Sequence, residues 1–260
     1  GEYWVATYGG GVARLNLNIP AGEGSTRSRF TAYEVSGDPA ANRVRVLRRD
    51  RAGQLWVGTE GGLFLLEERN SEVRFRLMEL GLASHPDDLV PVWALLEDRE
   101  GSLWIDTSVG LMRRLRDGRI SHILGYSFAD NPAVRSLLED GDGKIWLGQK
   151  AALIVLRPDA ASARVARQFT SAEGLIGERV RAMFRSTDGR IWIGTSACLN
   201  ELDGERFRSY GEVQGVQGGS INALAEDSDG NLWVGTDHGG ALRIAQKGFV
   251  SFKAADFPSH

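Results

Sequence analysis

The sequence predicts an all-β protein made of repeated four-stranded units, and three observations support this. Six of its seven tryptophans share one register and follow each other at intervals of 41 to 52 residues. Each of the six lies in a similar phrase, clearest at residues 227–236, which reads Asp-Ser-Asp-Gly-Asn-Leu-Trp-Val-Gly-Thr. The chain also has 33 glycines but only 7 prolines, which fits many tight turns between short strands. A self-similar period of this size indicates a repeat architecture. The six tryptophans are Trp4, Trp56, Trp104, Trp146, Trp192 and Trp233.

The first strand of each unit is expected to begin at a Val or Ile, twelve positions before the tryptophan. The turn that follows reads Asp-x-x-Gly, or Ser-x-x-Gly at Ser186. An Asp side chain that accepts a bond from the backbone two residues on, with a glycine at positive φ, makes a reverse turn. The Leu-Trp-Val-Gly-Thr phrase, rich in β-branched and aromatic residues, is the second strand. The expected first strands are residues 44–50, 92–98, 134–140, 180–186 and 221–227.

The third strand follows a glycine-bearing turn, as at residues 62–66 and 110–115. The fourth strand is aromatic and basic, as at residues 29–33, 206–210 and 249–252. Residues 16–28 are interpreted as an insertion between the third and fourth strands of the first unit. Helical periodicity is absent.

Four-stranded antiparallel units with this period predict a β-propeller, because one unit cannot bury both of its faces and neighbours must stack. We expect a single domain over residues 1–260, with six visible blades, five complete and the first without its inner strand. This count indicates a fragment of a propeller with seven or more blades. The tryptophans are expected to be buried between blades, as large packing residues. The repeats are residues 1–43, 44–91, 92–133, 134–179, 180–220 and 221–260.

Composition excludes several protein classes. The chain is 42% hydrophobic and 25% charged with a formal net charge of −3, which is ordinary for a globular protein and gives no electrostatic case for nucleic acid binding. No apolar run is long enough for a membrane helix and no signal peptide opens the sequence. The single cysteine, Cys198, excludes an internal disulfide and is expected to be a small packed residue.

The repeated phrase resembles a known family. Residues 226–236, followed by Gly-(Leu or Ala)-x-Arg and later by Phe-x-x-Tyr, are similar to the two-component regulator propeller repeat. The resemblance implies the extracytoplasmic, hence periplasmic, sensor of a bacterial hybrid histidine kinase or diguanylate cyclase, with small molecules or oligosaccharides as ligands. It also implies a membrane anchor outside this segment and a homodimer formed through the full-length receptor. In related propellers the first strand lines the central channel.

Candidate ligand residues follow the leading Val or Ile of each first strand, where the repeat varies. Three arginines and a tryptophan in such positions would suit an anionic or sugar-like ligand, through forked hydrogen bonds and ring stacking. The alternative is that the arginines pair with Glu97, Glu139 or Glu226 of neighbouring blades and that the tryptophan fills a gap. The candidate residues are Arg45, Trp93, Arg135, Arg181 and Asn222.

The turns after the second strands are expected to lie on the same face as these residues. Their tips carry Tyr8, Glu60, Ser108, Lys150, Ser196, Asp237 and His238, of which Tyr8, Lys150, Asp237 and His238 complete the predicted ligand set. Asp237-His238 alone does not make a catalytic constellation. The remaining histidines, His85, His122 and His260, are not spaced as metal ligands. We therefore expect no catalytic residues, no metal and no cofactor.

Two classes of function remain from the sequence. A sensory propeller would bind its ligand without converting it, and a purely structural protein–protein scaffold would look the same in sequence. A propeller enzyme, such as a lyase or a glycosidase, would need converging carboxylates or a His–Glu pair near the axis. The first strands carry arginines there instead, which favours the sensor.

Overall fold

The structure, a computed structural model, describes residues 3–16, 29–70, 72–82, 90–126, 136–216 and 218–245, and the backbone of 248–252. It divides the chain into two compact units, unit 1 (Gly1–Asn131) and unit 2 (Pro132–His260), each with three blades. Two short 3-10 helices, η1 (Ser171–Glu173) and η2 (Glu212–Gln214), are the helical segments of the described residues, and neither could cross a membrane. The predicted all-β propeller fold is confirmed. The assignment of residues 1–260 to one domain and the predicted fragment of a larger propeller stay predictions.

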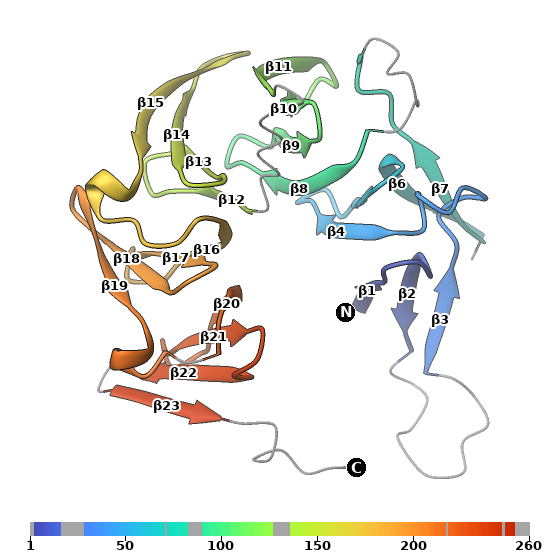
Figure 1. Ribbon diagram of the computed structural model, residues 1–260. Coiled ribbons are helices and arrows are strands. Elements are labelled where there is room, and N and C mark those ends of the chain that lie inside the picture. Colours follow the sequence, from blue (N-terminus) through green and yellow to red (C-terminus); the bar gives the residue numbers. More distant parts are fainter. Residues whose placement is uncertain are drawn as a thin grey trace, which may run out of the picture. The chain divides into compact units, whose positions relative to one another are not determined.

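Unit 1 holds blades 1 to 3, each an antiparallel meander of neighbouring strands (Figure 1). As predicted, blade 1 has three strands and the others have four. The predicted insertion at residues 16–28 lies largely outside the described residues. Blade 1 consists of β1 (Tyr3–Ala6), β2 (Val12–Leu15) and β3 (Phe30–Tyr33). Blade 2 consists of β4 (Val44–Arg49), β5 (Leu55–Thr59), β6 (Gly62–Arg69) and β7 (Glu72–Leu77). Blade 3 consists of β8 (Val92–Glu97), β9 (Leu103–Thr107), β10 (Gly110–Arg114) and β11 (Ile120–Gly125).

Unit 2 holds blades 4 to 6, each with four antiparallel strands in sequence order. Blade 4 consists of β12 (Ser136–Glu139), β13 (Ile145–Gly148), β14 (Leu153–Pro158) and β15 (Ala163–Phe169). Blade 5 consists of β16 (Val180–Arg185), β17 (Ile191–Thr195), β18 (Leu199–Asp203) and β19 (Arg206–Tyr210). Blade 6 consists of β20 (Ile221–Glu226), β21 (Leu232–Thr236), β22 (Ala241–Ala245) and β23 (Gly248–Phe252).

The Asp-x-x-Gly turn and the tryptophan form one hydrogen-bonded assembly. In blade 3, Oδ1 of Asp98 accepts the backbone N–H groups of Glu100 and Ser102 at 3.0 and 2.8 Å, while Oδ2 accepts the indole N–H of Trp104 at 2.8 Å. The bond to the indole recurs in three other blades, from Trp56 to Asp50, Trp146 to Asp140 and Trp233 to Asp227. One carboxylate therefore closes the turn and anchors the packing residue of the next strand.

The predicted burial of the tryptophans is confirmed inside each unit. Trp56, Trp104, Trp146 and Trp192 are at most 5% exposed. Trp4 and Trp233, in the first and last blades of the chain, are half-buried.

The glycine of the Trp-x-Gly-Thr phrase allows neighbouring blades to approach. A Cβ atom on Gly58 would lie 2.8 Å from Cγ1 of Val92, the leading residue of the next blade. A Cβ on Gly194 would lie 2.5 Å from Cγ2 of Ile221 in the same way. Because atoms cannot pack at such distances, this position requires glycine in blades 2, 4 and 5. Blades 1 and 3 carry Ala6 and Asp106 at the corresponding position.

A second contact joins successive blades through the glutamate that ends the first strand. Oε2 of Glu97 in blade 3 accepts the backbone N–H of Arg51 in blade 2 at 3.0 Å. Oε2 of Glu226 in blade 6 likewise accepts the N–H of Thr187 in blade 5 at 2.8 Å. These glutamates therefore hold the turn of the preceding blade, and they are not the partners of Arg45 and Arg181 that the sequence suggested as an alternative.

Candidate functional site

A β-bulge lies one residue into four of the first strands and coincides with the predicted ligand positions. The pairing of β4 with β5 skips one residue between Val44 and Val46, and the same shift occurs at Val92/Ala94, Val180/Ala182 and Ile221/Ala223. A bulge leaves its extra residue out of the ladder and re-aims its side chain, and bulges are common beside functional sites. The fifth candidate, Arg135, lies outside the described residues. The bulged residues are Arg45, Trp93, Arg181 and Asn222.

The tip of the turn after each second strand returns to the start of the first strand. The backbone N–H of Glu60 donates to the carbonyl of Arg43 at 3.1 Å, and that of Ser196 donates to the carbonyl of Arg179 at 2.9 Å. The same bond joins Asp237 to Ser220 at 3.0 Å. The tip residue therefore stands beside the bulged residue of its own blade, fifteen positions earlier in the chain.

In unit 1 these positions form a cluster centred on Glu60. Its Oε2 accepts Nη1 of Arg43 at 3.0 Å, and its Oε1 accepts the hydroxyl of Tyr8 at 2.8 Å and Nη2 of Arg45. Burial alone would raise the pKa of Glu60, but the bonds from Arg43, Arg45 and Tyr8 outweigh it and lower that pKa below its ordinary value. Glu60 therefore stays ionised and neutralises one of the two arginines.

Two aromatic rings hold the guanidinium of Arg45 in this cluster. Its Cζ lies 4.7 Å from the ring centroid of Tyr8 in blade 1 and 4.9 Å from that of Trp93 in blade 3. Each contact is within the range of a cation–π interaction. Arg45 therefore links three blades of unit 1. The indole N–H of Trp93 stays a buried donor without a partner among the described residues.

In unit 2 the bulged residues form a chain instead of a cluster. Nη1 of Arg181 donates to Oδ1 of Asn222 at 3.1 Å, and the amide of Asn222 donates to the carboxylate of Asp237. The bonds from Asn222 and Ser220 lower the pKa of Asp237. Arg181 thus reaches an acidic group through a neutral amide, and its buried Nε has no partner among the described residues.

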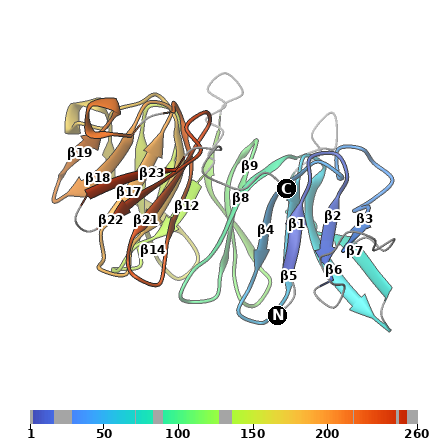
Figure 2. The same ribbon diagram turned by 90° about the horizontal axis from the view of Figure 1, so that it is seen from below.

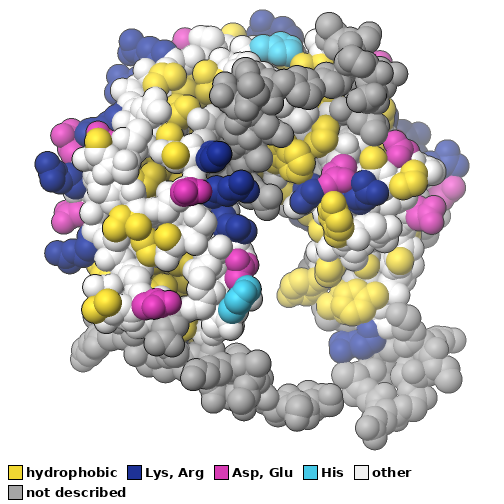
Figure 3. All heavy atoms as spheres, in the orientation of Figure 1, with side chains coloured by type: hydrophobic (Ala, Val, Ile, Leu, Met, Phe, Trp, Pro, Cys, Tyr) yellow, Lys and Arg dark blue, Asp and Glu magenta, His cyan; other side chains and the backbone are white. Residues whose placement is uncertain are grey.

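In unit 2, Lys150 lies in the turn after β13 of blade 4, and Arg179 directly precedes β16 of blade 5. They form an isolated antiparallel bridge, as Tyr8 and Arg43 do in unit 1. Figure 3 shows Lys and Arg side chains gathered over the first strands of unit 2, next to acidic and histidine side chains. The side chains of Lys150, Arg179 and Arg181 make no ion pair with the other described residues. This part of unit 2 is therefore basic and uncompensated.

The structure brings the predicted ligand residues together in two sets. Arg45 contacts both Tyr8 and Trp93 in unit 1, and Arg181, Asn222 and Asp237 are linked in unit 2. His238 follows Asp237 as an exposed tip residue. Whether these residues bind a ligand stays a prediction. The sequence analysis missed Arg43 and Arg179, although the motif Arg-Val-Arg occurs at both 43–45 and 179–181 and was the available signal.

Asp106 is a buried acid apart from both sets. It is 0% exposed, its Oδ1 accepts the hydroxyl of Tyr126 at 2.7 Å, and its Oδ2 has no hydrogen-bond partner among the described residues. Burial raises the pKa of Asp106 well above its ordinary value, and the Tyr126 bond opposes this only in part. Cys198 is also buried, which raises the pKa of its thiol.

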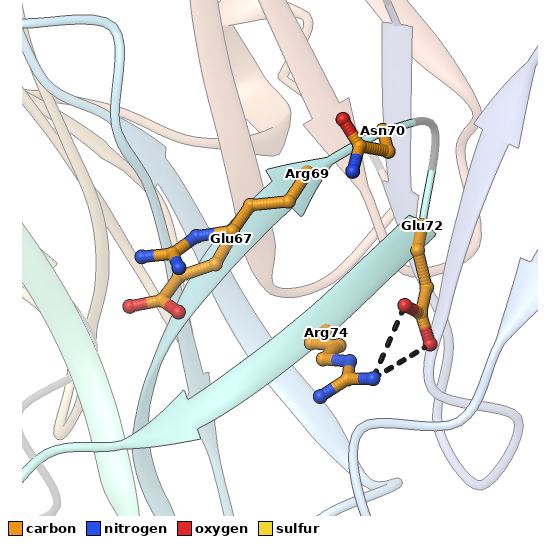
Figure 4. A pocket seen from close by; sticks show the side chains of 5 residues that line it. All are labelled: Glu67, Arg69, Asn70, Glu72 and Arg74. Atoms are coloured by element: carbon orange, nitrogen blue, oxygen red, sulfur yellow. Dashed lines mark hydrogen bonds and ion pairs between the residues drawn. The ribbon is translucent and has the colours of Figure 1, made fainter.

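A small hollow lies on the β6–β7 hairpin and is lined by charged residues. Figure 4 shows the side chains of Glu72 and Arg74, which pair with each other at 3.0 Å. Arg74 is 75% and Glu72 64% exposed, so this is a solvated pair at a hairpin. Within the described ranges, no group of three or more His, Cys, Asp or Glu residues lies close enough to hold a metal ion.

Comparisons with known proteins confirm the predicted resemblance. The family model described as two component regulator propeller matches residues 38–61, 127–150, 174–197 and 215–238. Three of these segments, residues 38–61, 174–197 and 215–238, include the bulge and the tip of their blade. No curated protein sequence matches the chain at a significant level.

Solved structures share the fold. The extracellular domain of a putative hybrid two component system from B. thetaiotaomicron matches 98% of this chain with a TM-score of 0.79 and 23% identity. The chain covers 33% of that protein's length. PorZ, a surface component of the type-IX secretion system of Porphyromonas gingivalis, matches 93% of this chain and 37% of its own, with a TM-score of 0.66 and 15% identity. Virginiamycin B lyase from Staphylococcus aureus matches 81% of this chain and 69% of its own, with a TM-score of 0.63 and 13% identity.

Proposed function

We propose that this chain is the ligand-sensing propeller of a bacterial signalling protein and that it binds a small molecule or an oligosaccharide without converting it. The observation that carries the proposal is the bulge in the first strand. It places the residues that vary between repeats, and not the packing residues, beside the tips of the turns. Repeat proteins keep their fold with recurrent positions and present binding groups from the varied ones.

The family match supports the signalling role. Four repeats match the two component regulator propeller, and the neighbour that shares the fold over 98% of the chain is named as an extracellular domain of a hybrid two component system. On this basis we place the chain outside the cytoplasm, as the input part of a two-component or diguanylate-cyclase protein. The output reaction, the membrane anchor and the partners of the whole protein are part of the same proposal.

A propeller enzyme is the alternative that the lyase neighbours raise, since virginiamycin B lyase has the same fold. An enzyme needs groups that converge on the reacting atoms. Among the described residues, the side chain of His238 makes no hydrogen bond to an acidic residue, and Asp237 is engaged by Asn222. The geometry therefore favours binding over conversion.

The proposal is tested by comparing two tryptophans in blade 3. Trp93 is a bulged residue whose ring covers Arg45, whereas Trp104 is a fully buried packing residue. With ligands identified from a library of sugars and small metabolites, Trp93→Ala should abolish binding while lowering the melting temperature less than Trp104→Ala. Binding that survives in Trp93→Ala, with equal losses of stability in the two variants, would contradict the proposal. Chromatography of the incubated ligand would reveal a product if the chain were an enzyme.

A further inference from the structure

We infer that unit 2 carries an oxyanion site, formed by Lys150, Arg179 and Arg181 beside Ser196, that takes the carboxylate group of an acidic ligand. The inference rests on the proposed ligand-binding function and specifies the chemistry of one part of its site. It follows from a comparison of two blades with the same motif and different tips.

Blade 2 shows what the motif does when its tip is acidic. Arg43 and Arg45 flank Val44, and the carboxylate of the tip residue Glu60 accepts bonds from both of them. A hydroxyl from the tip of the preceding blade, that of Tyr8, completes the set of donors. Two guanidinium groups and one neutral donor thus surround one carboxylate, which belongs to the protein itself.

Blade 5 repeats this arrangement without the carboxylate. Arg179 and Arg181 flank Val180, and Ser196 occupies the tip, held to the carbonyl of Arg179 as Glu60 is held to that of Arg43. Lys150 of the preceding blade takes the place of Tyr8, as its backbone bridge to Arg179 shows. The three donors are therefore all cations, and the residue that would neutralise them is a serine.

The cations at this position form no ion pair with the other described residues. Arg181 is half-buried, its side chain donates to the neutral amide of Asn222, and its buried Nε has no hydrogen-bond partner among the described residues. A guanidinium removed from water normally acquires an anionic partner, because its desolvation is otherwise uncompensated. A ligand carboxylate in the place that Glu60 occupies in blade 2 would supply that partner.

Two acidic residues lie near this position, and neither forms an ion pair with the three cations. Asp237 is bound to Asn222, and Arg181 acts on it only through space, where it helps to lower the pKa of Asp237. Glu178, next to Arg179 in sequence, makes no ion pair with the described residues, and its backbone N–H donates to the hydroxyl of Ser196 at 3.2 Å. His238 is exposed and adds to the positive side of the balance only when it is protonated.

The ligand class follows from this template. A carboxylate bound by two arginines and a lysine belongs to an acidic sugar or a small organic acid, whereas a neutral sugar offers these cations only uncharged hydroxyl acceptors, which bind them more weakly. The clearest probe pair is glucuronate and glucose, which differ by that carboxylate, with inorganic sulfate as a third probe for oxyanions of another shape.

The test uses calorimetric titration of the whole chain at constant ionic strength. Glucuronate should bind and glucose should bind about tenfold more weakly or not at all, since a charge-assisted hydrogen bond contributes that factor or more. Arg181→Gln should weaken the binding of glucuronate by about tenfold or more, whereas Arg74→Gln, on the β6–β7 hairpin of unit 1, should leave it unchanged. Sulfate binding with the same dependence on Arg181 would also support the oxyanion site.

A second pair of variants exchanges the tip residues of blades 2 and 5. One of its two measurements, the melting temperature, needs no ligand. Ser196→Glu places a carboxylate where blade 2 has one, so it should raise the melting temperature and abolish the binding of glucuronate. Glu60→Ser should open the equivalent set of donors in blade 2 and increase the number of glucuronate ions bound. Loss of the rise in melting temperature in the double variant Ser196→Glu/Arg181→Gln would identify Arg181 as the partner.

The outcomes separate this inference from the proposed function. Equal binding of glucuronate and glucose, or a Ser196→Glu variant that is no more stable and still binds glucuronate, would overturn the oxyanion site. Neutral oligosaccharides that bind in a manner dependent on Trp93 would then leave the sensor function standing. If glucuronate binds as expected but is converted to a product, the oxyanion site holds and the sensor function fails.

Discussion

Blades 2 and 5 are built on the same plan and differ in how they satisfy the same two arginines. In blade 2 of unit 1 the tip residue Glu60 holds Arg43 and Arg45, and two aromatic rings cover Arg45. In blade 5 of unit 2 the tip is Ser196, and Arg181 reaches an acid only through Asn222. The carboxylate that binds the two arginines can therefore come from the tip residue of the same blade, or it can be supplied by another molecule. The two arrangements differ at the tip residue, Glu60 or Ser196, and at the tip of the preceding blade, Tyr8 or Lys150, while both keep the Arg-Val-Arg motif.

The largest expected loss of stability concerns a feature that blades 2 and 5 share, the glycine against which the next blade packs. Gly58→Ala and Gly194→Ala place a Cβ atom within 2.8 Å of the next blade's leading residue in each unit. Each should lower the free energy of unfolding by about 2 to 3 kcal/mol, because the blades must move apart or the side chains must leave their rotamers. Denaturant unfolding measures this. Gly53→Ala, in a turn where a Cβ would meet no neighbour, is the control and should cost less, through its positive φ alone.

The next effect separates the two tips. Glu60→Ala leaves Arg43 and Arg45 without their carboxylate and should cost about 1 to 3 kcal/mol, since a partly buried charge loses its partner. Ser196→Ala removes one acceptor of a backbone bond and should cost about 1 kcal/mol or less. Equal losses in the two variants, measured by thermal and denaturant unfolding, would mean that the tips do not differ as described.

A pH experiment sharpens the comparison through Glu60 and Asp106. The lowered pKa of Glu60 gives stability that is present above its unfolded pKa and is lost as the pH falls toward the folded pKa, so Glu60→Gln should flatten the acid side of the stability curve. The raised pKa of Asp106 acts in the opposite sense, and stability is lost as the pH rises from its unfolded pKa through its folded pKa. Asp106→Asn should remove that loss and raise the melting temperature at neutral pH relative to acid. An unchanged pH profile in Asp106→Asn would show that Asp106 is ionised.

The smallest effect concerns Lys150 of blade 4 and Arg179 of blade 5. Lys150→Ala and Arg179→Ala remove exposed side chains that make no ion pair with the other described residues. Each should change the free energy of unfolding by about 0.5 kcal/mol or less in the absence of ligand. A marked destabilisation would reveal an internal partner and would argue against an open tip. Arg43→Ala, whose guanidinium is bound to Glu60, provides the matched variant and should cost more.

The fold could be predicted from the sequence because its signal is repeated. The tryptophan register, the Asp-x-x-Gly turn and the leading Val or Ile occur often enough to identify the blade, and the strands begin at Val44, Val92, Val180 and Ile221 as expected. The bond from each indole to the Asp of the preceding turn was not predicted, since it joins side chains six residues apart across a turn. Its geometry depends on the pairing of the strands.

The sequence identified the candidate site residues, but it did not predict the contacts between them. The variable residues Arg45 and Arg181 were identified by their place in the repeat, yet the bulge that displaces them becomes visible only when the strand register is known. Pairing of the arginines with Glu97, Glu139 or Glu226 of neighbouring blades was the alternative, and in the structure Glu97 and Glu226 bind the backbone N–H groups of Arg51 and Thr187. Asp106 gave no sequence warning beyond replacing a glycine, because burial is a property of the assembled blade.

The glutamate contact between blades has a consequence for how the chain is made. The backbone N–H of Arg51 donates to Glu97, which lies 46 residues further along the chain. The N–H of Thr187 donates to Glu226, which lies 39 residues further along. During synthesis from the N-terminus, blades 2 and 5 therefore leave the ribosome with a turn amide whose carboxylate partner lies in the following repeat. In these two places, the blade that is made later completes a hydrogen bond of the blade made before it.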